Sequence, residues 1–320
     1  MVANLVSASV PVELPPLEFH GDLDNNAPPV DTDADVIVHG SVRDSAKIKT
    51  RGSVRIEGDV HNAHLSADGD AEVTGGISGE ASDVRIGGDL HSRYIISATL
   101  RCAGSVNLDV EMVNTKLFCG GQLLMPTGAI AASTVHALQG LHCRAAGSDR
   151  GVACELIVGV DPDLNRMLVA HQTEIEKLHK LVLHVRRGLQ PLMDHMKQLS
   201  AEQKEKATEL LYQADEAEQR CKDLQAGVVA AHERYKKLRA PTVRFEERAH
   251  HGTSIRFPGS ILTLESDLTG PITLESEVHA SDERLYKIDA DGHRAPIYSR
   301  AAVDEARVLF RKLLAPIDKG

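Results

Sequence analysis

Glycine recurs through residues 36–158 about once every 18 positions, often followed by a small or acidic residue and then by an aliphatic one. Between the glycines run short stretches such as Val54-Arg55-Ile56 and Val84-Arg85-Ile86, in which every second side chain is apolar and one face can point to a shared interior. A unit this short cannot bury its own apolar face, so successive units must stack. The repeat therefore predicts a β-solenoid. The glycines of the main series are Gly52, Gly69, Gly88, Gly104, Gly121 and Gly140.

Composition agrees with thin stacked layers. The 320 residues are 42% apolar but only 3% aromatic, with no Trp, and the length allows two or three domains. A formal net charge of -10 argues against a nucleic-acid partner, which needs a concentrated basic face. Because no window approaches 18 uninterrupted apolar residues, we expect no membrane span.

Residues 1–35 contain seven acidic residues and several prolines but no Lys or Arg, and the first basic residue of the chain is Arg43. We expect a disordered or loosely docked acidic tail here. Without a basic start the segment is not typical of a secretory signal.

The five cysteines have irregular spacing and do not suggest a disulfide framework, so we expect a cytoplasmic location.

The apolar period changes to a helical one after Asp161-Pro162-Asp163. One heptad seam runs over residues 164–199 and a second over residues 207–238, and the capping-box pattern Ser200-Ala201-Glu202-Gln203 lies between them. Residues 161–240 are therefore predicted to form a long antiparallel coiled-coil hairpin. Two alternatives stay open. The first helix can break near Gly188, before Pro191, or the seams can pair between subunits in a homo-oligomer.

Strand patterns return after Pro241. We expect residues 241–284 to form a β segment that caps or extends the solenoid of residues 36–160. Residues 285–320 are expected to form a C-terminal hairpin around Asp291-Gly292 and a short amphipathic helix. The predicted fold is mainly β with a helical insertion: a right-handed parallel β-helix that carries the coiled-coil hairpin.

No residue pattern marks a catalytic, cofactor-binding or metal site. The histidine groups His250-His251, His136 with His142 and Cys143, and His61 with His64 lack the spacing of a structural zinc site. Asp289-Ala290-Asp291-Gly292 is similar to the start of a calcium loop, but the downstream Glu is missing, so we interpret it as a hairpin turn. Cys102 and Cys119, about one coil apart, are expected to form a buried pair of thiols.

Three features follow one another along the chain: the glycine-marked repeat, the junction Val158-Gly159-Val160-Asp161-Pro162 before the helices, and His251-Gly252-Thr253-Ser254-Ile255 after them. This order of parts resembles the flagellar assembly protein A family of bacteria. The resemblance covers residues 36–280 and implies a cytoplasmic, non-enzymatic protein linked to assembly or placement of the flagellum. The chain departs from the family pattern at both ends, since only the acidic residues 1–35 precede the repeat, and residues after 285 have no family counterpart.

The leading hypothesis is an interaction scaffold whose coiled-coil arm presents a surface to protein partners. One alternative is a self-assembling cytoskeletal polymer, because stacked coils with an open end can add subunits. Another is a β-helix acyltransferase, which the drifting repeat length disfavours because such enzymes use a six-residue repeat.

Overall fold

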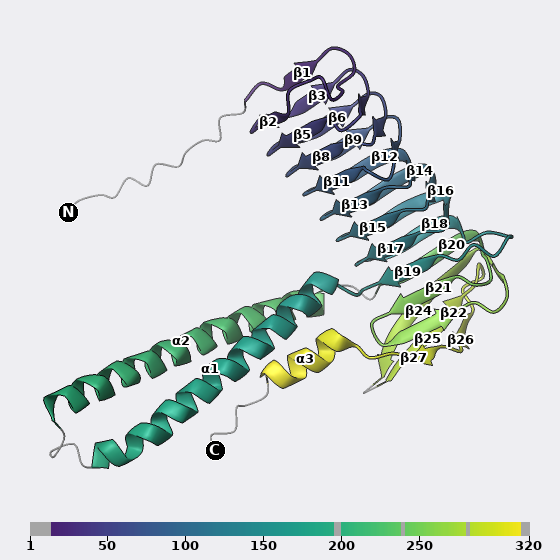
Figure 1. Cartoon of the computed structure of the whole chain (residues 1–320). Coiled ribbons are helices and arrows are strands. Elements are labelled where there is room, and N and C mark those ends of the chain that lie inside the picture. Colours follow the sequence, from purple (N-terminus) through teal and green to yellow (C-terminus); the bar gives the residue numbers. More distant parts are fainter. Residues whose placement is uncertain (1–13, 195–199, 238–240, 280–281, 315–320) are drawn as a thin grey trace, which may run out of the picture. The chain divides into compact units, whose positions relative to one another are not determined.

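A computed structural model describes two units of the chain (Figure 1). The first joins Met1–Val160 to Ala240–Ala301, and the second joins Asp161–Arg239 to Ala302–Gly320. The described residues are 14–194, 200–237, 241–279 and 282–314.

Stacked coils build the first unit, and each coil adds one strand to each of two sheets, called sheet A and sheet B (Figure 1). Strands of successive coils are parallel and in register, so that Val36 lies opposite Val54 and Val54 opposite Ala71. The predicted β-solenoid is confirmed. Its strands in sheet A are β1 (Leu17–Phe19), β3 (Val36–Val38), β6 (Val54–Ile56), β9 (Ala71–Val73), β12 (Leu90–Ile96), β14 (Val106–Val113), β16 (Leu123–Ala131), β18 (Gly140–Ala146) and β20 (Thr242–Ala249). Those in sheet B are β2 (Val30–Thr32), β5 (Lys47–Thr50), β8 (His64–Ala67), β11 (Asp83–Ile86), β13 (Thr99–Cys102), β15 (Lys116–Cys119), β17 (Thr134–Ala137), β19 (Glu155–Val158) and β21 (Ser254–Phe257).

A third, shorter row of strands belongs to the early coils. It consists of β4 (Val42–Arg43), β7 (Val60–His61) and β10 (Ile77–Ser78), and β10 pairs with the second half of β12. Inward positions of all three rows are almost completely buried and form one continuous apolar cluster. The outward positions between them are mostly exposed. This period-two burial is what the alternating sequence pattern predicts.

The glycine repeat is explained by a ladder of hydrogen bonds at one corner of the coils. The residues after Gly52, Gly69, Gly88 and Gly104, and Asp35 at the equivalent position of the preceding coil, use a side-chain oxygen to accept a hydrogen bond from the backbone N–H of the same position one coil later. Ser53 N–H donates to Asp35 Oδ1 at 2.7 Å, Asp70 N–H to Ser53 Oγ at 3.1 Å, and Asp89 N–H to Asp70 Oδ1 at 2.8 Å. A Cβ on the glycine of the next coil would overlap this accepting oxygen, as at Gly88 with Asp70. Close approach, and not positive φ, therefore requires the glycines from Gly52 to Gly121, whereas Gly140 has a φ of 114°.

A different device forms the corner before sheet B. Here a residue in the left-handed conformation precedes a small residue whose side chain points into the core. Asn62, Ser97, Asn114 and Ala132 have φ values of 47°, 54°, 49° and 52°. The residues after them are Ala63, Ala98, Thr115 and Ser133, and all four are buried. The sequence patterns above did not predict this second repeated corner.

The solenoid begins earlier than expected. From Leu17 on, residues assigned to an acidic tail form the first coil, with β1 parallel to β3 and β2 parallel to β5. The expectation for residues 1–35 was wrong for this part because the bases that neutralise its acids lie one coil later. Residues 1–13 lie outside the described residues. The ion pairs are Glu18–His39, Asp22–Arg43, Asp31–Lys49 and Asp33–Arg51.

Antiparallel strands follow β20 and β21. β22 (Ser260–Thr263) pairs with β21, and β24 (Ile272–His279) pairs with β20, so the parallel stacking stops there. β25 (Asp282–Ile288) and β26 (Arg294–Ile297) extend sheet A as a hairpin. The expected boundary at residue 285 was therefore misplaced: it falls inside β25, because that strand pairs with β24. Two short strands, β23 (Leu268–Thr269) and β27 (Arg300–Ala301), pair with β20 and β22.

The second unit holds the three helices of the described chain: α1 (Pro162–Asp194), α2 (Ala201–Lys237) and α3 (Glu305–Leu314). Asp161 caps α1, since its Oδ1 accepts from Asp163 N–H at 2.9 Å and Leu164 N–H at 3.1 Å, and Pro162 fills the first helical position. α1 runs without interruption through Gly188. The predicted capping box of α2 is confirmed: Ser200 N–H donates to Gln203 Oε1 at 2.9 Å, and Gln203 N–H donates to Ser200 Oγ at 3.2 Å. The seam positions Met196, Leu199 and Leu238 lie outside the described residues.

Candidate functional site

Two apolar clusters join α1 to α2. Near the start of α1, Leu168 and Ile175 are buried with Val228 of α2. Further along, Val185 and Leu189 of α1 are buried with Ala214 of α2. The late part of α1 thus meets the early part of α2, and the two helices lie side by side in opposite directions (Figure 1).

The short helix α3 completes the first of these clusters. Its Leu309, Phe310 and Leu313 are buried against α1 and α2, and the Phe310 ring centroid lies 5.5 Å from that of Tyr235. Asp304 caps α3 by accepting from Arg307 N–H at 3.0 Å, and its other oxygen accepts from the Tyr235 hydroxyl at 3.0 Å. The sequence pattern indicates the helix but not its partner. The apolar face formed by residues 306–313 is the sequence feature that indicates packing of this helix against another element.

Ion pairs flank the helix contact. Arg186 lies 2.7 Å from Glu218, and Arg220 lies 3.5 Å from Glu174. All four side chains are at least one-third exposed, so each pair contributes only about 0.2–1 kcal/mol. His171, which lies on the predicted seam, faces the small Gly227 across the helices, at 3.9 Å from a Cβ placed there. The apolar clusters, and not these polar groups, hold the helices together.

Several apolar side chains of the two long helices face solvent. Tyr212 is 71% exposed, and Val169, Leu181 and Val229 are between 43% and 52% exposed. Tyr212 belongs to neither apolar cluster. An exposed aromatic side chain on a helix is the type of residue that is enriched in protein interfaces.

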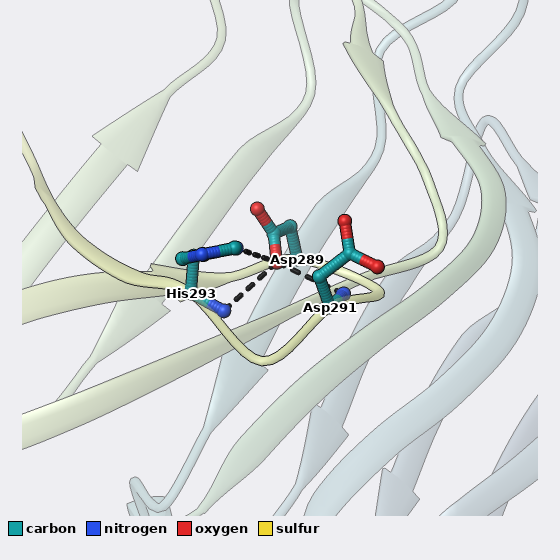
Figure 2. A group of neighbouring side chains, drawn as sticks. All are labelled: Asp289, Asp291 and His293. Carbon is teal, nitrogen blue, oxygen red and sulfur yellow. Dashed lines mark hydrogen bonds and ion pairs between the residues drawn. The ribbon is translucent and has the colours of Figure 1, made fainter.

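Asp289, Asp291 and His293 gather at the turn between β25 and β26 (Figure 2). Each offers a metal-ligating atom within 4.8 Å of the others, and all three are exposed. Asp289 Oδ1, however, already accepts hydrogen bonds from Asp291 N–H at 3.0 Å and His293 N–H at 2.9 Å. These hydrogen bonds lower the pKa of Asp289, and the bond from His293 N–H is the largest cause. Gly292, with φ of 80°, completes the turn. The cluster therefore serves the hairpin.

The histidine groups seen in the sequence are separated by the fold. His61 Nδ1 lies 2.9 Å from Ser78 Oγ, whereas His64 is on the outer face of sheet B. His142 Nε2 lies 2.6 Å from Glu246 on sheet A, while His136 is on sheet B and the thiol of Cys143 points inward. His250-His251 is different, because both rings approach the carboxylate of Asp267, at 3.4 and 3.3 Å. The pKa of Asp267 is lowered, first by the hydrogen bond from the backbone N–H of His251 and then by the two histidine rings.

Cys102 and Cys119 lie opposite each other in β13 and β15, buried and unpaired by disulfide. Their thiols donate to the Gly88 and Gly104 carbonyls at 3.0 and 3.2 Å. Burial raises the pKa of Cys102 to about 11 and that of Cys119 to about 12. Such thiols are unreactive at neutral pH, so this pair belongs to the core.

An open groove of about 490 Å³ runs along sheet A over the early coils. Its lining includes Ile37 and Asn107 at outward positions of sheet A, together with Asp70 and Asp89 of the hydrogen-bond ladder. Arg55 lies 3.6 Å from Glu72 beside it. Both signs of charge line the groove, and the carboxylates of the ladder are engaged with backbone N–H groups, so no group here stands out as a nucleophile or general base.

Comparisons with known proteins agree with the architecture. The family model described as Flagellar Assembly Protein A beta solenoid domain matches residues 15–278. No curated protein and no solved structure matches the chain. Among the described helices, none combines the length and apolar character needed to cross a bilayer.

Proposed function

Because the chain belongs to the Flagellar Assembly Protein A family, we propose that it is a non-enzymatic scaffold of flagellar assembly in the bacterial cytoplasm. In this proposal the solenoid is a rigid mount, and α1 with α2 forms an arm that presents a protein-binding surface. The family match supports the link to the flagellum. The role of the arm rests on its own packing and surface.

We further propose that the solenoid is a right-handed parallel β-helix and that the arm is an antiparallel coiled-coil hairpin. Support for the hairpin comes from the heptad positions Leu168, Ile175, Val182, Val185 and Leu189, which are all buried. Ion pairs flanking an apolar seam are also typical of coiled coils.

The observation that carries the proposal is the combination of a well-packed end of the arm and exposed apolar side chains beyond it. α3 buries four side chains against the first part of α1 and the last part of α2, which stabilises that end of the arm. Tyr212 and Leu181, beyond the cluster that contains α3, leave apolar surface in solvent. Folding alone does not need these exposed side chains, whereas binding of a protein partner would bury them.

The test compares three strains of a flagellated bacterium that carries this chain: wild type, a deletion, and an arm truncation. The truncation replaces residues 179–216 with a short Gly-Ser linker, which keeps Leu168, Val228 and α3 together. Flagella per cell are counted by electron microscopy. We expect both altered strains to lose or misplace flagella. Normal flagella in the deletion strain would refute the flagellar role, and normal flagella in the truncation strain alone would refute the role of the arm.

A self-assembling polymer is the alternative function. It is favoured by the first strand of each sheet, β1 and β2. Among the described residues each of these strands pairs with one neighbour only, so its other edge could pair with a strand of a second copy. Sedimentation velocity over a range of protein concentrations separates the two accounts, since a polymer grows with concentration and a scaffold of fixed size does not.

A further inference from the structure

The side of α1 that points away from α2 is a continuous exposed surface. Leu168, Ile175 and Leu189 are buried on the side of α1 that packs against α2. On the opposite side, exposed positions recur in steps of four and three residues from Thr173 to Arg187. We call this surface the outer stripe of α1. It consists of Thr173, Glu176, Lys177, Lys180, Leu181, His184, Arg187 and Gly188, which are all exposed.

The cations of the outer stripe have no counterion in the described part of the chain. Lys177, Lys180 and Arg187 form no ion pair with another described residue, whereas Arg166 and Arg186, the other arginines of α1, are both paired with carboxylates. The carboxylates of a partner can therefore approach these three cations without displacing an acidic residue of this chain. Charge-assisted hydrogen bonds of this kind are about twice as strong as neutral ones.

One acidic residue lies within the outer stripe, and it already has a partner. Glu176 Oε1 accepts a hydrogen bond from the side-chain amide of Gln172 at 2.8 Å. Three basic residues and one acidic residue give the stripe a formal charge of +2 with His184 neutral, against -10 for the whole chain. α2 carries eight acidic and seven basic residues, so the positive surface of the arm is specific to α1.

An apolar side chain lies among the cations of the outer stripe. Leu181 is 43% exposed and directly follows Lys180. At Gly188 an added Cβ would meet no atom within 4 Å, so the surface there is open, and the missing side chain lets another backbone approach closely. A straight positive stripe with one apolar contact point has the shape and charge to receive a helix that carries acidic residues beside an apolar stripe.

We propose that the outer stripe binds an acidic amphipathic helix of a partner protein. This proposal rests on the proposed role of the arm as a protein-binding surface and names the class of its partner. From Thr173 to Gly188 the stripe is about 22 Å long at about 1.5 Å per residue, which matches about four turns of a partner helix. A membrane surface fits less well, because Leu181 is the one large apolar side chain within the stripe, whereas helices that lie in a bilayer interface insert a broad apolar face.

Fluorescence anisotropy with the full chain tests the proposal at about 0.15 M salt, where exposed charges more than about 8 Å apart are largely screened. The probe is a labelled, designed helical peptide of about 16 residues in which glutamates flank a stripe of leucine and alanine. The variant Lys180→Glu with Arg187→Glu is expected to bind at least about tenfold more weakly, because like charges then face each other. The matched variant Lys204→Glu with Lys222→Glu makes the same change in net charge at exposed positions of α2, and its binding should stay within about twofold of wild type.

An apolar substitution tests the contact at Leu181. Leu181→Ala should weaken binding about threefold without changing its salt dependence, because it removes apolar contact area and no charge. Val229→Ala, at a 48% exposed position of α2, is the matched control and should leave binding unchanged. Circular dichroism of each variant checks that the fold is retained.

Four outcomes would overturn the proposal. Equal losses in the two charge-reversal variants would indicate attraction to net charge alone, and absence of binding by the wild-type chain would show that the stripe does not receive an acidic helix. Tighter binding of phosphatidylserine vesicles, lost in the Lys180→Glu with Arg187→Glu variant, would assign the stripe to a membrane surface. Self-association of the wild-type chain that the same variant abolishes would assign it to a second copy.

The flagellar counts of the arm-truncation strain separate this proposal from the role of the arm itself. If the truncation strain loses its flagella but the peptide does not bind, the arm keeps its role and the acidic helix is refuted. If the truncation strain has normal flagella but the peptide binds as expected, the outer stripe is supported as a binding surface and the flagellar role of the arm is refuted.

Discussion

Replacing Gly88 with alanine is expected to destabilise the solenoid by about 2–3 kcal/mol. The added Cβ would overlap Asp70 Oδ1, and it would lie 3.0 Å from both Asp70 N and Gly69 C. Asp70 must then release the backbone N–H of Asp89, which loses a hydrogen bond worth about 0.5–1.5 kcal/mol. Crowding against the backbone adds about 1–3 kcal/mol. The lower chain entropy of the unfolded alanine variant offsets about 0.4–1 kcal/mol.

Chemical denaturation followed by circular dichroism measures this change, and hydrogen exchange of peptides that cover residues 69–90 localises it. Gly188→Ala is the matched control. Gly188 lies in α1 with no atom within 4 Å of the added Cβ, so the same substitution should stabilise the helix by about 0.5–1 kcal/mol.

A double-mutant cycle separates the clash from other effects. Asp70→Ala removes the oxygen that the new Cβ meets, so Gly88→Ala should cost about 1 kcal/mol less in that background. If Gly88→Ala changes the free energy of unfolding by less than about 0.5 kcal/mol, or if the two substitutions are additive, the ladder does not explain the glycine repeat.

Three further outcomes are expected. Phe310→Ala should destabilise the helical unit by about 3–5 kcal/mol in thermal unfolding, because the ring is 2% exposed, whereas Val308→Ala, at a 40% exposed position, should have little effect; equal effects would show that α3 does not dock. Iodoacetamide at pH 8 should label native Cys221 before Cys102 or Cys119, because Cys221 is half-buried and the other two are buried with pKa values raised to about 11 and about 12; early labelling of Cys102 by mass spectrometry would contradict this burial. The pKa of His39 is raised, first by its bond to Glu57, so this pair, which joins the second coil to the third, stabilises the solenoid below pH 6.5 and the contribution disappears as pH rises through the folded pKa. Glu57→Gln should lower that pKa in an NMR titration, and an unchanged titration would show that the bond between His39 and Glu57 does not form.

Much of the fold was accessible from the sequence because its strongest signals are local. Gly88 and its equivalents recur where each coil crowds the previous one. The Ser200 to Gln203 capping box involves four consecutive residues, and the heptad seams need only the helical period. The flagellar assembly protein A resemblance is confirmed by the family match to residues 15–278.

What escaped prediction depends on residues far apart in sequence. Asp22 and Asp31 were misread as part of a tail because their partners Arg43 and Lys49 lie one coil later. The left-handed position of this corner is Asn62, Ser97, Asn114 or Ala132 in successive coils, so it has no single residue type, only a shared backbone conformation, and it leaves little trace in the sequence. The docking of Phe310 against Tyr235 joins segments separated by the whole C-terminal β region.

The candidate interaction surfaces could be predicted only in outline. The exposed position of Tyr212 follows from the heptad pattern, because it lies off the seam.

In-cell photo-crosslinking tests the central claim most directly. A photoreactive amino acid replaces Tyr212 in one strain and Tyr298 in another; Tyr298 is 92% exposed and belongs to the first unit, so it serves as the control. The scaffold account predicts a discrete protein adduct at position 212 that is missing at position 298. No adduct at 212, or the same adducts at both positions, would contradict the claim that the helical arm presents the binding surface.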